Sequence, residues 1–98
     1  MKKGYWIVRV DIKDQDKFMS YVNENPHALN KYQAKYLVRA GQFEVLEGNS
    51  RSRNTIVEFP TYQAALDCWH SPEYQKAKSL REGAADIDIV IIEGYDAV

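Results

Sequence analysis

Residues Gly4-Tyr-Trp-Ile-Val-Arg-Val-Asp11 form a run of β-branched and aromatic side chains that is typical of a β-strand. Alternate side chains of a strand point to opposite faces of its sheet. One face of this strand therefore holds an unbroken apolar series, Trp6, Val8, Val10 and Ile12. The other face is apolar at one end and charged at the other, with Tyr5, Ile7, Arg9 and Asp11. The stretch predicts a strand whose fully apolar face is covered by helices.

Two helices and three further strands are expected after this first strand. Asp14 is a predicted helix N-cap, and the pairs Asn25-Pro26 and Ser71-Pro72 predict that each helix stops once and begins again. The other strands are expected at Tyr36–Ala40, continuing through Phe43–Leu46, at Thr55–Phe59 and at Ile87–Glu93. The order βαββαβ predicts a single α+β, ferredoxin-like domain over residues 1–98, with a four-stranded antiparallel sheet and helices on one face.

The face of the sheet that the helices leave open is also rich in apolar residues. The last strand is apolar on both faces, and the middle strands place bulk on both sides through Leu37, Val38, Ile56 and Val57. An exposed apolar patch of this kind marks an interaction surface. No residues are left over to cover it, so a second copy of the chain is the expected cover. The sequence predicts a homodimer through the open face.

Composition and charge narrow the class of protein. The chain has 13 Lys and Arg against 14 Asp and Glu, which gives no electrostatic footprint for nucleic acid or an anionic membrane. Arg51 and Arg53 flank the turn at Gly48 and are interpreted as solvated surface charges. The single cysteine, Cys68, cannot form an intramolecular disulfide and is interpreted as a buried packing residue. With neither a signal-peptide pattern nor a membrane-length apolar run, a cytoplasmic protein is expected.

Four charged residues are expected on the open face: Arg9 and Asp11 from the first strand, Arg39 from the second and Glu58 from the third. A charge held among apolar groups must be paired or must bind something, because an unpaired one is costly. In one interpretation, Arg39 or Arg9 holds a small anionic ligand through two parallel hydrogen bonds. In the other, an arginine and Glu58 form an ion pair at the interface between two copies.

Other residues are candidates for proton transfer or for the wall of a substrate pocket. His27 or Asp11 would move a proton, although an exposed histidine in a helix's first turn is the simpler interpretation of His27. His27 and His70 lack Cys or carboxylate partners at ligand spacing, so neither a metal nor another cofactor is expected. The aromatic residues around the second helix, Tyr62, Trp69 and Tyr74, fit the core by their spacing and also fit the wall of a substrate pocket. Arg81, expected in the last turn of that helix, is a further substrate-binding candidate, or it only complements the helix dipole.

The order of several short motifs resembles a known family. These motifs are Tyr36-Leu-Val-Arg-Ala-Gly41, Leu46-Glu-Gly48, Ile56-Val-Glu-Phe-Pro60, Ala64 to Trp69, Ser71-Pro-Glu-Tyr-Gln75 and Arg81. Together they are similar to the bacterial domain-of-unknown-function family DUF1330. The resemblance implies a dimeric α/β barrel, in which two ferredoxin-like sheets close face to face. That superfamily includes cofactor-free monooxygenases, haem-degrading enzymes and muconolactone-isomerase-like proteins.

Two hypotheses about function follow from the residues and the resemblance. In the first, the chain is a cofactor-independent enzyme, monooxygenase-like or isomerase-like, acting on a small acidic or enolisable substrate. Arg39 would bind the anion and Glu58 would orient it. In the second, it is a non-catalytic ligand-binding or structural homodimer whose charged cluster only fixes the pairing of the two copies. An enzyme needs a proton-transfer group close to the arginine. The positions of Asp11 and His27 relative to Arg39 therefore distinguish the two hypotheses.

Overall fold

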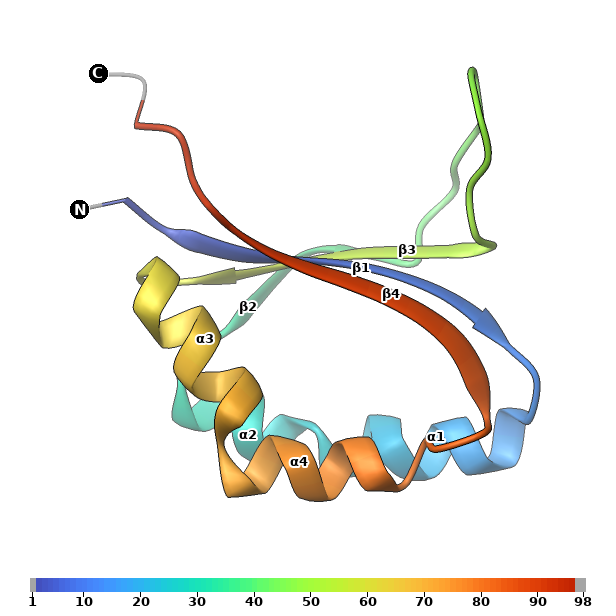
Figure 1. Cartoon of the computed structure of the whole chain (residues 1–98), viewed down its shortest axis with the longest axis horizontal. Coiled ribbons are helices and arrows are strands. Elements are labelled where there is room, and N and C mark those ends of the chain that lie inside the picture. Colours follow the sequence, from blue (N-terminus) through green and yellow to red (C-terminus); the bar gives the residue numbers. More distant parts are fainter. Residues whose placement is uncertain (1, 97–98) are drawn as a thin grey trace.

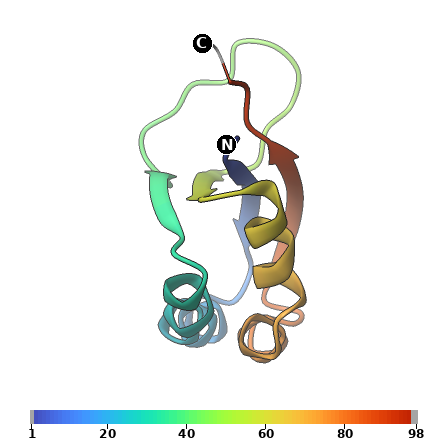
Figure 2. The ribbon, with the colours of Figure 1, turned by 90° about the vertical axis from the view of Figure 1, so that its left-hand side faces the viewer.

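The computed structural model describes residues 2–96, which contain four strands and four helices (Figure 1). In chain order the elements are β1 (Gly4–Ile12), α1 (Gln15–Glu24), α2 (Pro26–Lys31), β2 (Lys35–Arg39), β3 (Arg53–Phe59), α3 (Tyr62–His70), α4 (Pro72–Ser79) and β4 (Ala85–Glu93). The strands form one antiparallel sheet in the order β2-β3-β1-β4. All four helices lie on the same side of this sheet (Figures 1 and 2). The predicted α+β, ferredoxin-like arrangement is therefore confirmed.

Each predicted helix is interrupted at its Asn-Pro or Ser-Pro pair. Proline supplies no N–H and is tolerated only in the first turn of a helix, so it starts α2 at Pro26 and α4 at Pro72. Ser71 serves both of its helices, because its hydroxyl donates to the Cys68 carbonyl at 2.7 Å and accepts from the Tyr74 N–H at 3.1 Å. These breaks turn the helices so that they follow the curved underside of the sheet (Figure 1).

The core lies between the helices and the predicted apolar face of β1. Trp6 is 2% exposed and donates a hydrogen bond from Nε1 to the Ala65 carbonyl of α3 at 3.0 Å. Its ring lies 5.1 Å from Phe59 and 4.9 Å from Tyr74, both of which are fully buried. Burial raises the pKa of the neighbouring Cys68 thiol to about 12, so this cysteine stays protonated and acts in packing.

The predicted continuation of the second strand through Phe43–Leu46 is wrong. Ala40 has a left-handed backbone with φ of 51°, and its N–H makes a bond to the Asn54 carbonyl at 2.8 Å. Beyond this point the chain leaves the sheet, and residues 40–52 rise on the side opposite the helices (Figure 1). We call residues 40–52 the arm. Its apolar side chains are exposed, with Leu46 at 87%.

Among the helices of residues 2–96, none has the length and apolar character needed to cross a membrane.

The start of β1 tests the close packing of the sheet against α3. A Cβ added at Gly4 would lie 2.6 Å from the Thr61 carbonyl oxygen, so Gly4→Ala forces the backbone at the start of α3 to move. We expect a loss of about 1–3 kcal/mol in the free energy of unfolding, measured by urea denaturation. Gly41→Ala is the matched control, because nothing lies within 4 Å of its added Cβ. Equal stabilities for the two variants would contradict this account.

Candidate functional site

An irregularity in β2 decides which side chains reach the space under the sheet. Tyr36 lies opposite Val57, but the next paired residue is Val38, opposite Ile56, and the register shifts between them at Leu37. One extra residue in a strand moves every later side chain to the other face. Arg39, opposite Thr55, therefore lies on the helix-covered face with Tyr36. The expectation that Arg39 shares the open face with Leu37 and Glu58 is wrong for this reason.

A cavity lies between the sheet and the two helices α1 and α2. Its volume is about 50 Å³, measured as space for the centre of a water-sized sphere, which holds a few waters or part of a small ligand. Most of its lining is apolar and comes from β1, β3, β4 and the inner sides of α1 and α2. The polar lining residues are Tyr21, Asn25, Tyr36, Arg39, Arg53 and Thr55.

Two arginines project into this space from adjacent strands. Thr55 lies opposite Arg39 and two residues beyond Arg53 on β3, so the arginines are diagonal neighbours on one face. The Arg39 guanidinium stacks 4.5 Å from the centre of the Tyr36 ring, and that of Arg53 lies 5.9 Å from the Phe18 ring. In the described part of the chain, neither arginine has a carboxylate within ion-pair distance. The pair is therefore free to bind an anion.

Uncharged hydrogen-bonding groups stand beside the arginines. Asn25 is only 5% exposed, yet its side chain does not cap α2, so the amide is available to the cavity. Burial raises the pKa of the Tyr36 phenol, while Arg39, the Asn25 side chain and Arg53 act in the opposite direction. Tyr36 is thus a neutral phenol at physiological pH and can donate its proton in a hydrogen bond.

The other predicted substrate-binding residues of the helices do not line the cavity. Tyr74 is fully buried, and Trp69 packs against it with ring centres 5.3 Å apart, so both belong to the core. Arg81 lies behind Tyr74, with Nη2 3.4 Å from the Tyr74 hydroxyl. Tyr62 is 37% exposed at the start of α3.

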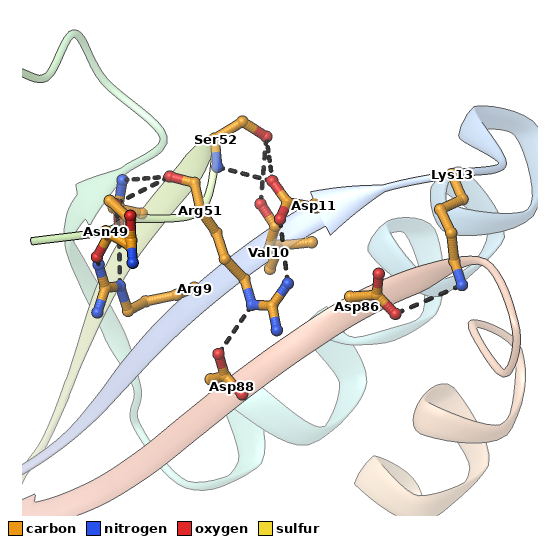
Figure 3. A network of polar contacts seen from close by, with 11 residues as sticks. Arg9, Val10, Asp11, Lys13, Asn49, Arg51, Ser52, Asp86 and Asp88 are labelled. Atoms are coloured by element: carbon orange, nitrogen blue, oxygen red, sulfur yellow. Dashed lines mark hydrogen bonds and ion pairs between the residues drawn. The ribbon is translucent and has the colours of Figure 1, made fainter. Parts of the chain in front are cut away.

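The charged residues of the open face are held in a separate network (Figure 3). Arg51, at the base of the arm, donates to Asp11 at 3.0 Å and to Asp88 at 2.8 Å, and so joins β1 to β4. Asp11 also accepts from the N–H of Ser52 at 2.8 Å and from its hydroxyl at 2.9 Å. Arg9 donates to the Asn54 side chain at 3.3 Å. Interpreting Arg51 as merely solvated was therefore wrong.

Glu58 makes no ion pair with an arginine of its own chain among the described residues. It accepts a hydrogen bond from the Tyr5 hydroxyl at 3.2 Å and pairs with Lys3 at 3.4 Å. Neither proton-transfer candidate lines the cavity: Asp11 lies on the open face, and His27 is exposed on α2. The structure therefore groups Arg39 with residues that the sequence did not single out.

Those residues had weak signals in the sequence. Asn25 was visible only as a helix cap, and Tyr21 and Tyr36 as aromatic residues of a helix and a strand. Arg53 was visible as a hairpin charge. Nothing local shows that these four share one cavity, because they come from three elements and a helix break.

The sheet, its one-sided helical layer and the cavity between them define a ferredoxin-like α+β protein with a partly polar internal cavity. The chain belongs to the family described as a domain of unknown function, DUF1330, whose model matches residues 3–95. The resemblance seen in the sequence motifs is thereby confirmed. No curated protein shows a significant match to the chain.

Solved structures share the fold at low sequence identity. The RPA0582 protein of unknown function from Rhodopseudomonas palustris is 18% identical with a TM-score of 0.76, over 97% of this chain and 84% of that chain. SnoaB, a cofactor-independent oxygenase from Streptomyces nogalater, is 6% identical with a TM-score of 0.63, over 100% and 98%. A dimeric, ferredoxin-like protein of unknown function from Bacteroides fragilis is 14% identical with a TM-score of 0.54, over 93% and 95%.

The network at the base of the arm gives a pH-dependent prediction. Hydrogen bonds from Ser52, first its backbone N–H and then its hydroxyl, lower the pKa of Asp11 below its usual value, and Arg51 adds to the effect. A carboxylate with a lowered folded-state pKa stabilises the protein above its unfolded pKa of about 4, and this contribution disappears as the pH falls through the folded value. We therefore expect Asp11→Asn to lower the free energy of unfolding at pH 7. At a pH below the folded-state pKa of Asp11, the wild-type side chain is neutral too, and the variant should then be about as stable as the wild type.

Urea denaturation at several pH values measures this difference. Asp67→Asn is the control, because Asp67 is exposed on α3, away from the arm, where its side chain accepts a hydrogen bond from Gln63. An Asp11→Asn deficit that stays constant down to the lowest pH would show that the carboxylate charge is not what holds the arm.

Proposed function

We propose that this chain binds a small carboxylic acid in the cavity and acts on it without a metal or organic cofactor. The observation that carries this proposal is the pair Arg39 and Arg53, two arginines without carboxylate partners in the described chain, at an otherwise mostly apolar cavity. Guanidinium groups hold a carboxylate through parallel hydrogen bonds. The apolar lining then receives the hydrocarbon part of the same molecule.

The chemistry of the lining favours an enolisable substrate. Two positive charges, the Tyr36 phenol and the Asn25 amide would stabilise negative charge that develops on an enol or enolate oxygen. Among residues 2–96, those that line the cavity include no histidine or carboxylate. The proton released from the carbon next to the carbonyl would therefore pass to a water molecule in the cavity, and the neighbouring arginines would lower the pKa of this carbon acid by stabilising the enolate. In an isomerase-like reaction this anion would take a proton back at a different carbon, and in a monooxygenase-like reaction it would react with dioxygen as the oxidant. The fold shared with the cofactor-independent oxygenase SnoaB is compatible with the monooxygenase-like reaction.

A non-catalytic ligand-binding protein is the second candidate. Its support is the position of Asp11 and His27, because neither proton-transfer candidate lines the cavity. The binding site is the same in both cases, so the two candidates differ only in whether the bound acid reacts.

We also infer that two copies pair through the open face. A continuous apolar row crosses all four strands there, formed by Val90, Ile7, Ile56 and Val38. Val90 and Val38 are 57% and 42% exposed in the single chain. Charges of both signs flank the row, which suits a self-complementary two-fold contact, and the ferredoxin-like protein from Bacteroides fragilis is described as dimeric. The arm rises beside the same face and would contact the second copy of the chain (Figure 1).

Binding of the acid is tested by thermal shift with benzoate, salicylate and acetoacetate. A ligand at about a hundred times its Kd adds about 2.7 kcal/mol, which for this size is a shift on the order of ten degrees. We expect a shift for the wild type that is lost in Arg39→Met and Arg53→Met. Arg9→Met, on the open face, is the control and should retain it. Loss in all three variants, or in none, would count against the site.

The reaction itself is tested on whichever acid binds. Proton exchange at the carbon next to the carbonyl is followed by NMR in heavy water, and oxygen uptake by electrode. We expect exchange or uptake in the wild type, reduced at least about tenfold in Arg39→Met, which corresponds to about 1.4 kcal/mol of lost transition-state stabilisation. Binding without either signal favours the non-catalytic candidate.

The dimer is tested by sedimentation velocity. Val90→Lys places a charge in the centre of the apolar row and should give a folded monomer, because the new ammonium group would be desolvated in the contact. Met19→Lys is the control, since Met19 is 40% exposed on α1, away from the open face. A wild type that is monomeric at micromolar concentration would contradict the inference.

A further inference from the structure

Two tyrosines and an arginine form a hydrogen-bonded series that ends at the cavity. The Tyr74 hydroxyl lies 2.8 Å from the Tyr21 hydroxyl, and Arg81 Nη2 lies 3.4 Å from the same Tyr74 oxygen. The Arg81 guanidinium also stacks 5.0 Å from the centre of the Tyr21 ring. Tyr74 is fully buried, whereas Tyr21 lines the cavity. The series therefore runs from Arg81, two residues beyond the end of α4, through Tyr74 of α4 in the core, to Tyr21 of α1 at the cavity.

The direction of these hydrogen bonds follows from which groups can donate. Arginine has donors and no acceptor, so Arg81 donates to the Tyr74 oxygen. Tyr74 must then place its own proton, and among the described residues Tyr21 is its other partner. If Tyr21 donated to Tyr74 instead, the Tyr74 proton would be buried without an acceptor, which is costly. Tyr74 therefore donates, and the Tyr21 oxygen accepts.

This direction leaves the Tyr21 proton for the cavity. A hydroxyl has one proton, so Tyr21, having accepted from Tyr74, can donate only to something else. Donation along a series strengthens each later donor, and here the series begins at a cation. Arg81 Nε is buried and has no hydrogen-bond partner, so this charge is only partly satisfied by the protein. Burial also raises the pKa of Tyr74, which keeps its proton in place at physiological pH.

We propose that Tyr21 is the oriented hydrogen-bond donor of the cavity, aligned by Tyr74 and Arg81, and that it recognises a carbonyl or enolate oxygen of the ligand. This inference rests on the proposed function and specifies its substrate class. The ligand is an acid with two separate oxygen functions, a carboxylate for Arg39 and Arg53 and a second acceptor for Tyr21. Tyr74 and Arg81 are positioning residues, since they act through Tyr21 and do not line the cavity.

Matched probes separate the two oxygen functions. The first pair is 4-acetylbenzoate and 4-isopropylbenzoate, which share the carboxylate and overall shape but differ in the carbonyl acceptor; the 3-substituted pair covers a second geometry. We expect Tyr21→Phe to weaken the acetyl acid about fivefold to tenfold and to leave the isopropyl acid unchanged, as measured by calorimetric titration. Tyr74→Phe and Arg81→Met should weaken the acetyl acid by less, again with no change for the isopropyl acid.

Tyr62→Phe is the matched control, because Tyr62 lies outside the cavity lining. The Tyr62→Phe protein should bind both probes as tightly as the wild type does. Equal losses for the acetyl and isopropyl acids in Tyr21→Phe would overturn the proposal, since they would show a steric effect. An unchanged acetyl acid would overturn it as well.

Neutron diffraction of a ligand-free, deuterium-exchanged crystal tests the direction without any probe or variant. We expect the deuteron between the two hydroxyls on the Tyr74 oxygen, and the Tyr21 deuteron turned toward the cavity. A deuteron on Tyr21 that points to Tyr74 would overturn the proposal whatever the ligand is. If no acid binds the wild type, the proposed function fails, and the neutron map still decides the direction of the series.

Discussion

The register of β1 against β3 and β4 is the constraint on which both faces of this protein depend. Cross-strand partners share a face, so this one ladder assembles complete rows of side chains across the sheet. The row through Trp6 packs under the helices, and Trp6 is tied to α3 by its bond to the Ala65 carbonyl. The row through Ile7 crosses the open face. A slip of one residue would exchange the two rows and bury the charges of Arg9 and Asp11 in place of the tryptophan.

The fold could be predicted from the sequence because its signals are local and agree with one another. Strict alternation in β1, a cap followed by proline at each helix break, and the βαββαβ order all point to the same arrangement. One part of the arm, Phe43–Leu46, is predicted as strand because its composition is strand-like. Composition does not reveal that Ala40 adopts a left-handed conformation, which directs the following residues away from their partner.

The site was harder to predict, because its members are brought together by packing over long sequence separations. The sequence named Arg39 as a candidate ligand-binding residue but placed it on the wrong face, because simple alternation along a strand does not allow for a residue that the strand pairing skips. Tyr21 and Tyr74 are 53 residues apart, and each has the spacing of an ordinary core residue in a helix. Their hydroxyl groups can form a hydrogen bond beside the cavity only because the two helices pack together there.

The irregularity at Leu37 makes the face on which Arg39 lies depend on local backbone geometry rather than on residue type. A relative of the same length whose β2 paired regularly through this position would keep the arginine, the composition and the strand, yet carry the guanidinium on the opposite side of the sheet. Alignments of such relatives would pair arginines that do not correspond in space. Within one fold, the gain or loss of this irregularity thus separates a chain with the arginine at the cavity from a chain with the arginine on the open face.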